Sequence, residues 1–144
     1  MIDLLNNISD NDFKEILVRD IKECAICLLT EQNKAAIIMS GSIIEALLMN
    51  KIFENGIEKY EIGSLTNKSS KIKKVIDMDI NELLFVVDNE KLLKKEHIHL
   101  SHFARSYRNI IHPACEIRKG SKISDEDASF MWNILVRLLR AIFL

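Results

Sequence analysis

Residues 102–114, HFARSYRNIIHPA, hold the side chains of this chain that are best suited to chemistry on a phosphate. Arg105, Arg108, Asn109 and His112 lie within eight positions of an otherwise apolar stretch. An arginine guanidinium is a permanent cation whose planar fork fits phosphate oxygens. A histidine with an ordinary pKa of about 6.5 exchanges protons at neutral pH. These residue types together indicate recognition of a phosphate ester, or proton transfer beside one.

The same residues are predicted to share one side of a helix over about 97–111. At about 100° per residue, the polar side chains lie within about 60° of Arg105. This polar stripe consists of Ser101, Arg105, Arg108, Asn109 and His112, and the apolar side opposite it of Leu100, Phe103, Ala104, Tyr107, Ile110, Ile111 and Ala114. Because Pro113 disfavours α geometry in the residue before it, His112 is expected at the C-terminal turn.

The alternative interpretation of the stripe is a solvated helix face without a further role. Cations in the last turn of a helix also complement its macrodipole. Lysine and glutamate would solvate such a face equally well, and the stripe has neither. Paired arginines beside asparagine and histidine therefore favour phosphate recognition.

The stretch RSYRNIIHP resembles the signature of the HEPN superfamily, in which an arginine precedes a histidine by four to six residues. KAAIIMSGSIIEALL, residues 34–48, is similar to the long central helix of that superfamily. The resemblance implies a homodimer of helical bundles in which both motif helices line a shared cleft. It also implies a metal-independent endoribonuclease that needs no cofactor and acts as a toxin or in antiviral defence. An antitoxin or a nucleotidyltransferase is the partner that such a toxin implies.

Carried onto this chain, the resemblance makes Arg105 and His112 catalytic and Arg108 and Asn109 substrate-binding. Arg105 matches the family spacing, whereas Arg108 has the neighbouring asparagine, so either arginine is a candidate for the motif position. In some family toxins a partner modifies a tyrosine two places after the histidine, and Ala114 occupies that place here. Other family members lack catalysis, and a non-catalytic module for dimerisation and for binding a partner or nucleotide is the alternative function.

Glu45 is the carboxylate of interest outside the motif, because it lies in the most apolar predicted helix. Burying an unpaired carboxylate is unfavourable, so Glu45 is expected to reach solvent or to pair with a motif arginine at the substrate site. The basic run Lys68–Lys74 either is a solvated loop or guides an RNA backbone into the cleft.

Two weaker groups of metal-binding residue types are predicted to be structural. Cys24 and Cys27 form a CxxC without a second pair, and their place in a helical pattern favours buried apolar residues over a metal site. His97, His99 and His102 do not share one helical face, so no zinc site is predicted there.

Composition and length define the class of protein. The chain has 144 residues, 48% of them hydrophobic and 28% charged, which predicts one folded domain with a real core. Its net charge of −1 provides no global attraction to nucleic acid. The N-terminal residues lack a signal peptide, the apolar stretch 35–49 is judged too short and polar to span a bilayer, and three cysteines suggest reduced thiols. A cytoplasmic protein without membrane contact is expected.

Helical periodicity predicts an all-α, up-and-down bundle of about five helices. The predicted helices begin after Ser9 or Asp10, cover about 34–53, lie within 73–95, cover about 97–111, and begin after Ser124. Asn55–Gly56 is the predicted stop of the second helix. Residues 57–72, which are polar and turn-rich, are predicted to form a loop.

Overall fold

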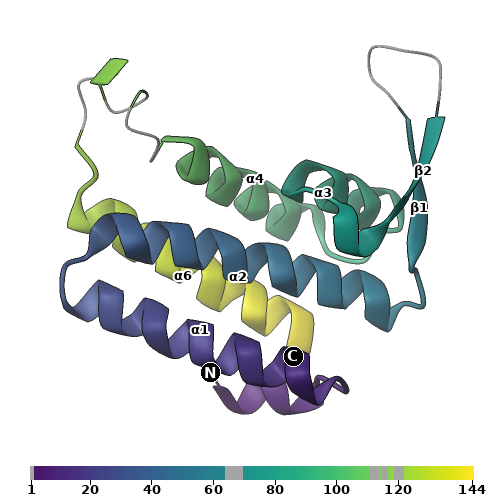
Figure 1. Cartoon of the computed structure of the whole chain (residues 1–144), viewed down its shortest axis with the longest axis horizontal. Helices are drawn as coiled ribbons and strands as arrows, with labels where there is room; N and C mark the ends of the chain where they lie inside the picture. Colours follow the sequence, from purple (N-terminus) through teal and green to yellow (C-terminus); the bar gives the residue numbers. More distant parts are fainter. Residues whose placement is uncertain (1, 64–69, 111–113, 115–116, 119–121) are drawn as a thin grey trace.

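The computed structural model of the chain is a helical bundle with one small β-hairpin (Figure 1). It describes residues 2–63, 70–110, 114, 117–118 and 122–144, without the side chains of 70 and 108–110. The elements are η1 (Ile2–Asn7), α1 (Asn11–Leu29), α2 (Asn33–Glu54), β1 (Lys59–Gly63), β2 (Ser70–Lys74), η2 (Val75–Asp77), α3 (Ile80–Asn89), α4 (Lys95–Ile110) and α6 (Asp125–Phe143). The all-α class predicted from the sequence is confirmed.

Helix α2 is the central element, and it packs against α1, α3, α4 and α6. Its apolar residues are not confined to one face, as expected for a helix with neighbours on several sides. The helix has 22 residues, so the expectation that this segment is too short to span a membrane was wrong on length and hydropathy. However, 56% of its most apolar window is buried inside the bundle, as in a core helix.

Local signals placed the helix ends correctly. The Asp10 side chain accepts a hydrogen bond from the Phe13 amide (3.0 Å) and starts α1. Ser124 starts α6 in a capping box, in which its side chain and that of Asp127 each bind the other's backbone amide. Helix α2 ends at Asn55, and Gly56 follows with φ of +75°, a left-handed conformation that suits glycine. These ends confirm the predicted boundaries.

The predicted loop over 57–72 was wrong, because β1 and β2 form an antiparallel hairpin there. Tyr60 and Ile62 are half-buried while the residues between them are exposed, which is the two-residue period of a strand. Tyr60 packs edge-on against Phe85 of α3, and its hydroxyl donates a hydrogen bond to Glu90 (2.6 Å). The strand pattern is short and mostly polar, so it resembles a turn-rich loop in the sequence.

Helix α3 occupies only part of the region predicted as helical, 73–95. It begins at a capping box formed by Asp79 and Glu82. The stretch ELLFVVD is helical, as predicted, and its buried residues face the core despite their β-branched side chains. Lys91, with φ of +53°, lies in the short connection to α4.

Candidate functional site

Helix α4 carries the arginines of the phosphate-binding motif toward one end of the bundle. Arg105 is half-buried, and among the described residues no carboxylate pairs with it. Arg108 and Asn109 belong to the last turn of α4, and their side chains lie outside the described part. His112 lies outside the described residues altogether. Arg105 is therefore the motif side chain whose surroundings the structure defines.

The two sides of α4 differ from the predicted stripe in two places. Ser101 was predicted in the polar stripe, but it is fully buried and donates a hydrogen bond to the His97 carbonyl (3.0 Å). Phe103 was predicted on the apolar side, but its side chain is 56% exposed. Ala104 is fully buried, as predicted. The small Ser101 and Ala104 form the centre of the packed face, so Arg105 lies at its border and is half-buried.

Tyr107 joins the end of α4 to the start of α6. Its hydroxyl lies 3.1 Å from an Asp127 carboxylate oxygen, and its ring contacts that of Phe130 with centroids 5.7 Å apart. Burial, followed by the bond to Asp127, raises the pKa of Tyr107. The Ser124 backbone amide is the largest cause that lowers the pKa of Asp127. The carboxylate nearest to the motif end is thus held by its own helix cap and by a tyrosine.

Glu45 lies half-buried on α2, the helix that packs directly against α4. It takes part in contacts within the fold. Its position on a neighbouring helix agrees with the expected proximity to α4. The specific pairing of Glu45 with a motif arginine stays a prediction.

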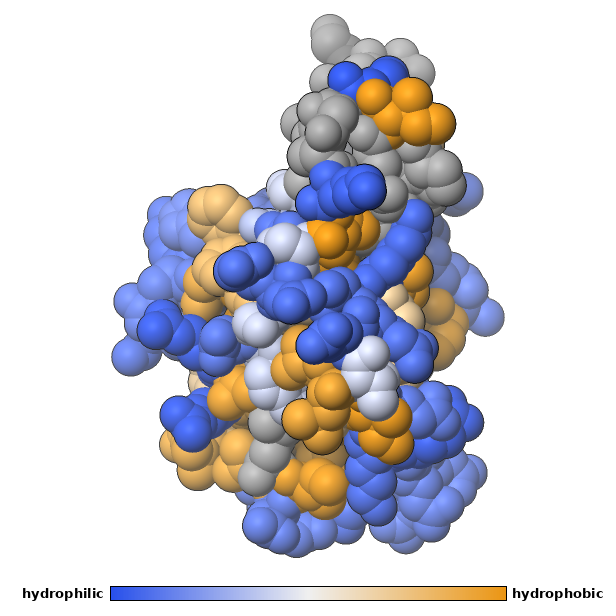
Figure 2. Space-filling model, turned by 90° about the vertical axis from the view of Figure 1, so that its left-hand side faces the viewer, coloured by the Kyte–Doolittle hydropathy of each residue, from blue (hydrophilic) through white to orange (hydrophobic). Residues whose placement is uncertain are grey.

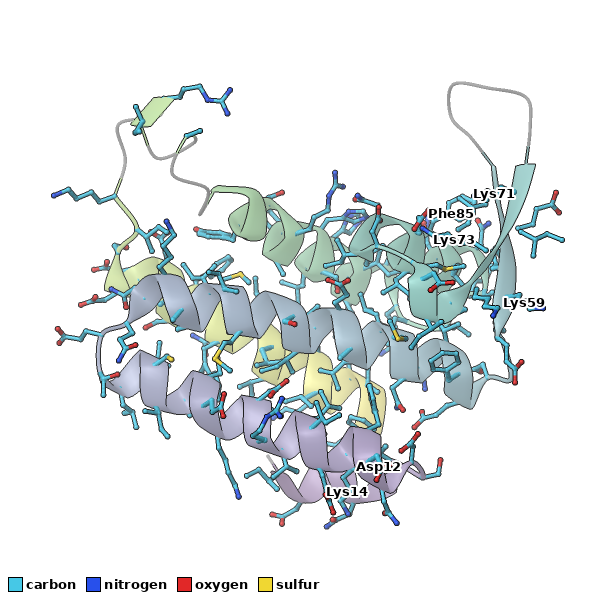
Figure 3. All side chains as sticks on the ribbon, viewed as in Figure 1. Asp12, Lys14, Lys59, Lys71, Lys73 and Phe85 are labelled. Atoms are coloured by element: carbon cyan, nitrogen blue, oxygen red, sulfur yellow. The ribbon has the colours of Figure 1, made fainter. Side chains whose placement is uncertain are left out.

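The basic run lies far from the motif within one chain. Lys71, Lys73 and Lys74 belong to β2, whose hairpin lies at the opposite end of the bundle from the last turn of α4 (Figures 1 and 3). The 16 residues of α4 correspond to about 24 Å of helix between the two ends. Lys73 forms a salt bridge with Glu82 (2.7 Å), which raises the pKa of Lys73. The run therefore does not border the motif of its own chain.

The CxxC cysteines occupy structural positions. Cys24 is fully buried, with its Sγ 3.2 Å from the Ser40 hydroxyl and 3.5 Å from the Ala36 carbonyl oxygen. Burial raises the pKa of the Cys24 thiol, which disfavours the thiolate that metals and redox reactions need. Cys27 is partly buried, and both thiols are free. The prediction that Cys24 behaves as a small core residue is confirmed.

The histidines at the start of α4 are dispersed. His99 and His102 are exposed, whereas His97 is half-buried with its Nε2 3.6 Å from Glu96. Within the part of the chain that the structure describes, no three histidine, cysteine or carboxylate side chains are placed to hold a metal ion.

A groove between α4 and α6 was not predicted from the sequence. It has a volume of about 510 Å³ and is lined by Leu100, Phe130, Asn133, Ile134, Val136, Arg137 and Arg140. Phe130 was assigned to the apolar face of the last helix, yet its side chain is 42% exposed. The sequence signal for the groove was the presence of Phe130 and Arg137 on one side of α6, seven residues apart.

The end of the bundle at which α4 finishes has a mixed surface. Figure 2 looks onto this end and shows hydrophobic residues interspersed with hydrophilic ones. Ionic and apolar contacts are therefore both available here to a bound molecule.

Comparisons with protein-family models, with curated proteins and with solved structures give no match for this chain. The function is consequently argued from the site itself and from the motif residues.

Proposed function

We propose that this chain is a metal-independent endoribonuclease of the HEPN type that cleaves RNA at a cleft of a homodimer in the cytoplasm, as a toxin or antiviral effector. The observation that carries the proposal is Arg105, a half-buried cation without a described carboxylate partner. It precedes Asn109 by one turn and the sequence position of His112 by about two. A cation already held by the fold can stabilise charge on a phosphate without the reorganisation that a mobile lysine needs.

The chemistry proposed for the site divides between two residues. His112 transfers a proton between the ribose 2′-hydroxyl and the scissile phosphate, which its ordinary pKa range permits near pH 7. Arg105 stabilises the negative charge that develops on the phosphorane oxygens. Arg108 and Asn109 bind neighbouring phosphate or ribose groups, and Glu45 orients an arginine from α2. No step of this reaction calls for a metal ion.

Cleavage of RNA in the presence of EDTA tests the proposal. The purified protein is incubated with a pool of single-stranded RNAs of varied sequence, and the products are sequenced. We expect the wild type to cleave and His112→Ala to lose cleavage while its circular dichroism spectrum is unchanged. Arg105→Ala is expected to slow cleavage by about 100- to 1,000-fold, the scale for removing one oxyanion contact.

Arg108→Ala separates binding from catalysis in the same assay. If Arg108 contacts a phosphate, its loss weakens RNA binding and reduces the slope of log affinity against log salt by about one unit. Arg118→Ala is the matched control, because Arg118 is exposed and lies outside α4. Intact RNA with the wild type at every salt concentration would overturn the enzymatic proposal.

The second candidate is a non-catalytic module that dimerises and binds a protein partner or a nucleotide. The groove between α4 and α6 favours it, because an exposed aromatic ring beside two arginines suits association. A wild-type protein that leaves the RNA pool intact but co-purifies with an antitoxin or nucleotidyltransferase supports this function.

A further inference from the structure

Helix α6 presents one continuous stripe to solvent along its length. The α6 stripe consists of Glu126, Ser129, Phe130, Asn133, Val136, Arg137 and Arg140. At 100° per residue these positions lie within about 60° of Asn133, and all are exposed except the half-buried Val136. The large apolar residues of the helix, such as Leu135 and Leu138, are buried on the other side. The stripe is thus the one long face of α6 that no described element covers.

The charges of the stripe are arranged by sign. Glu126 is at its N-terminal end, and Arg137 and Arg140 are at its C-terminal end. The helix macrodipole alone favours this order of charges. It does not explain why Phe130 is 42% exposed between them, beside a groove that Arg137 also lines. An aromatic ring and a neighbouring groove on one surface indicate that something is bound there.

The stripe is complementary to a second copy of itself. When two copies of α6 pair antiparallel about a two-fold axis at Asn133, positions whose numbers add up to about 266 face each other. Glu126 then faces the partner subunit's Arg140. Phe130 faces the partner subunit's Arg137 and enters the partner's groove, where ring and guanidinium attract each other. The symmetry repeats both contacts, as in any isologous interface.

We propose that this chain forms an isologous homodimer through the α6 stripe, with the ring of Phe130 seated in the groove of the other copy. The occupant is a second copy because the stripe supplies both halves of each contact, the acid and the arginine, the ring and the groove. The interface does not depend on RNA cleavage, so it stands or fails separately from the proposed function.

The geometry of this dimer has a consequence for the motif. Helix α4 flanks α6 on the Phe130 side, because Tyr107 contacts Phe130 and Leu100 lines the same groove. A two-fold axis perpendicular to antiparallel helices leaves the α4 helices of both copies on one side of the α6 pair. They form the walls of a shared cleft, and the Phe130–Arg137 contacts form its floor. If the proposed function holds, each motif end lies near the partner subunit's Arg137 and Arg140.

Charge reversal tests the interface by sedimentation velocity at about 50 μM protein and low salt. We expect a dimer for the wild type. Glu126→Arg and Arg140→Glu should each be monomeric, because each places like charges opposite one another twice. An equimolar mixture of the two variants should form heterodimers, since both contacts are then complementary. The double variant Glu126→Arg/Arg140→Glu should regain the homodimer.

Matched controls carry the same charge changes on the far helix α1, as Glu15→Arg and Lys22→Glu, both exposed positions. These should remain dimeric, and thermal melts should show that all variants are folded. Monomeric wild type, single variants that stay dimeric, or a mixture that fails to associate would each overturn the proposed interface. RNA cleavage by the wild type is measured in parallel, so that failure of the interface is distinguishable from failure of the enzymatic proposal.

Discussion

Helices α4 and α6 lie side by side and antiparallel, yet their sequences predict their buried faces with unequal success (Figure 1). In α6 the predicted apolar residues Ile134, Leu135, Leu138 and Leu139 are all buried, and Phe130 is the exception. In α4 the predicted faces were wrong at Ser101 and Phe103. Both helices are amphipathic, so amphipathicity alone does not account for the difference.

The size of the buried residues explains the difference. The core face of α6 consists of large aliphatic residues, whose transfer out of water dominates the orientation of the helix. The centre of the buried face of α4 consists of Ser101 and Ala104, which contribute little area but allow α4 to approach the bundle closely. Hydropathy ranks Phe103 above both, although close approach decides which side is covered. Small residues at a helix interface are therefore underestimated by hydropathy patterns.

The largest expected effect is the loss of a leucine from the buried face of α6. Leu135→Ala should lower the free energy of unfolding by about 2–5 kcal/mol, because Leu135 is fully buried and its removal leaves a cavity. Urea denaturation followed by circular dichroism measures this. Ser129→Ala on the exposed side of the same helix is the control, with a change of about 0.5 kcal/mol or less. Equal effects for the two variants would contradict the assigned faces.

A second, smaller effect is expected where α4 packs closely. Ala104→Leu should lower the free energy of unfolding by about 1–3 kcal/mol, because no space surrounds the fully buried Ala104. Phe103→Ala should change it by about 0.5 kcal/mol or less, since Phe103 is exposed. If the sequence-based faces were right, Phe103→Ala would instead cost about 3–5 kcal/mol. Denaturation of the two variants therefore decides between the faces.

The smallest effect concerns the cap that joins α6 to α4. The pKa of Asp127 is lowered in the folded state, so its contribution is complete above the unfolded pKa of about 4 and is lost as pH falls through the folded value. Asp127→Asn should lower stability by about 1 kcal/mol at pH 7. Its deficit relative to the wild type should shrink as the pH falls below about 4.

Thermal melting between pH 7 and pH 2.5 follows this deficit. Tyr107→Phe is the control, because it removes the phenol but leaves the Ser124 amide, the largest cause of the lowered pKa. It should therefore retain most of the pH dependence. A deficit for Asp127→Asn that stays constant down to pH 2.5 would show that the carboxylate charge is not stabilised by the cap.

The features predicted correctly depend on near neighbours in the chain. Asp10 and Ser124 cap their helices through amides three residues away, and Gly56 needs only its own conformational freedom. The hairpin was missed because its stability comes from elsewhere: Tyr60 contacts Phe85 and Glu90, and Lys73 contacts Glu82. A polar strand with an alternating pattern over five residues carries too little local signal to compete with loop composition.

The sequence by itself determined the helical class, the caps and the chemistry of the motif, because these follow from residue types within one or two turns of each other. Only the tertiary structure placed the basic hairpin at the far end of the bundle from the motif, buried Ser101, exposed Phe103, and set Phe130 beside Arg137 at an open groove. Those outcomes depend on which helix lies against which, and on how closely. Burial is a property of neighbours in space, and the residues that decide it here are distant in the chain.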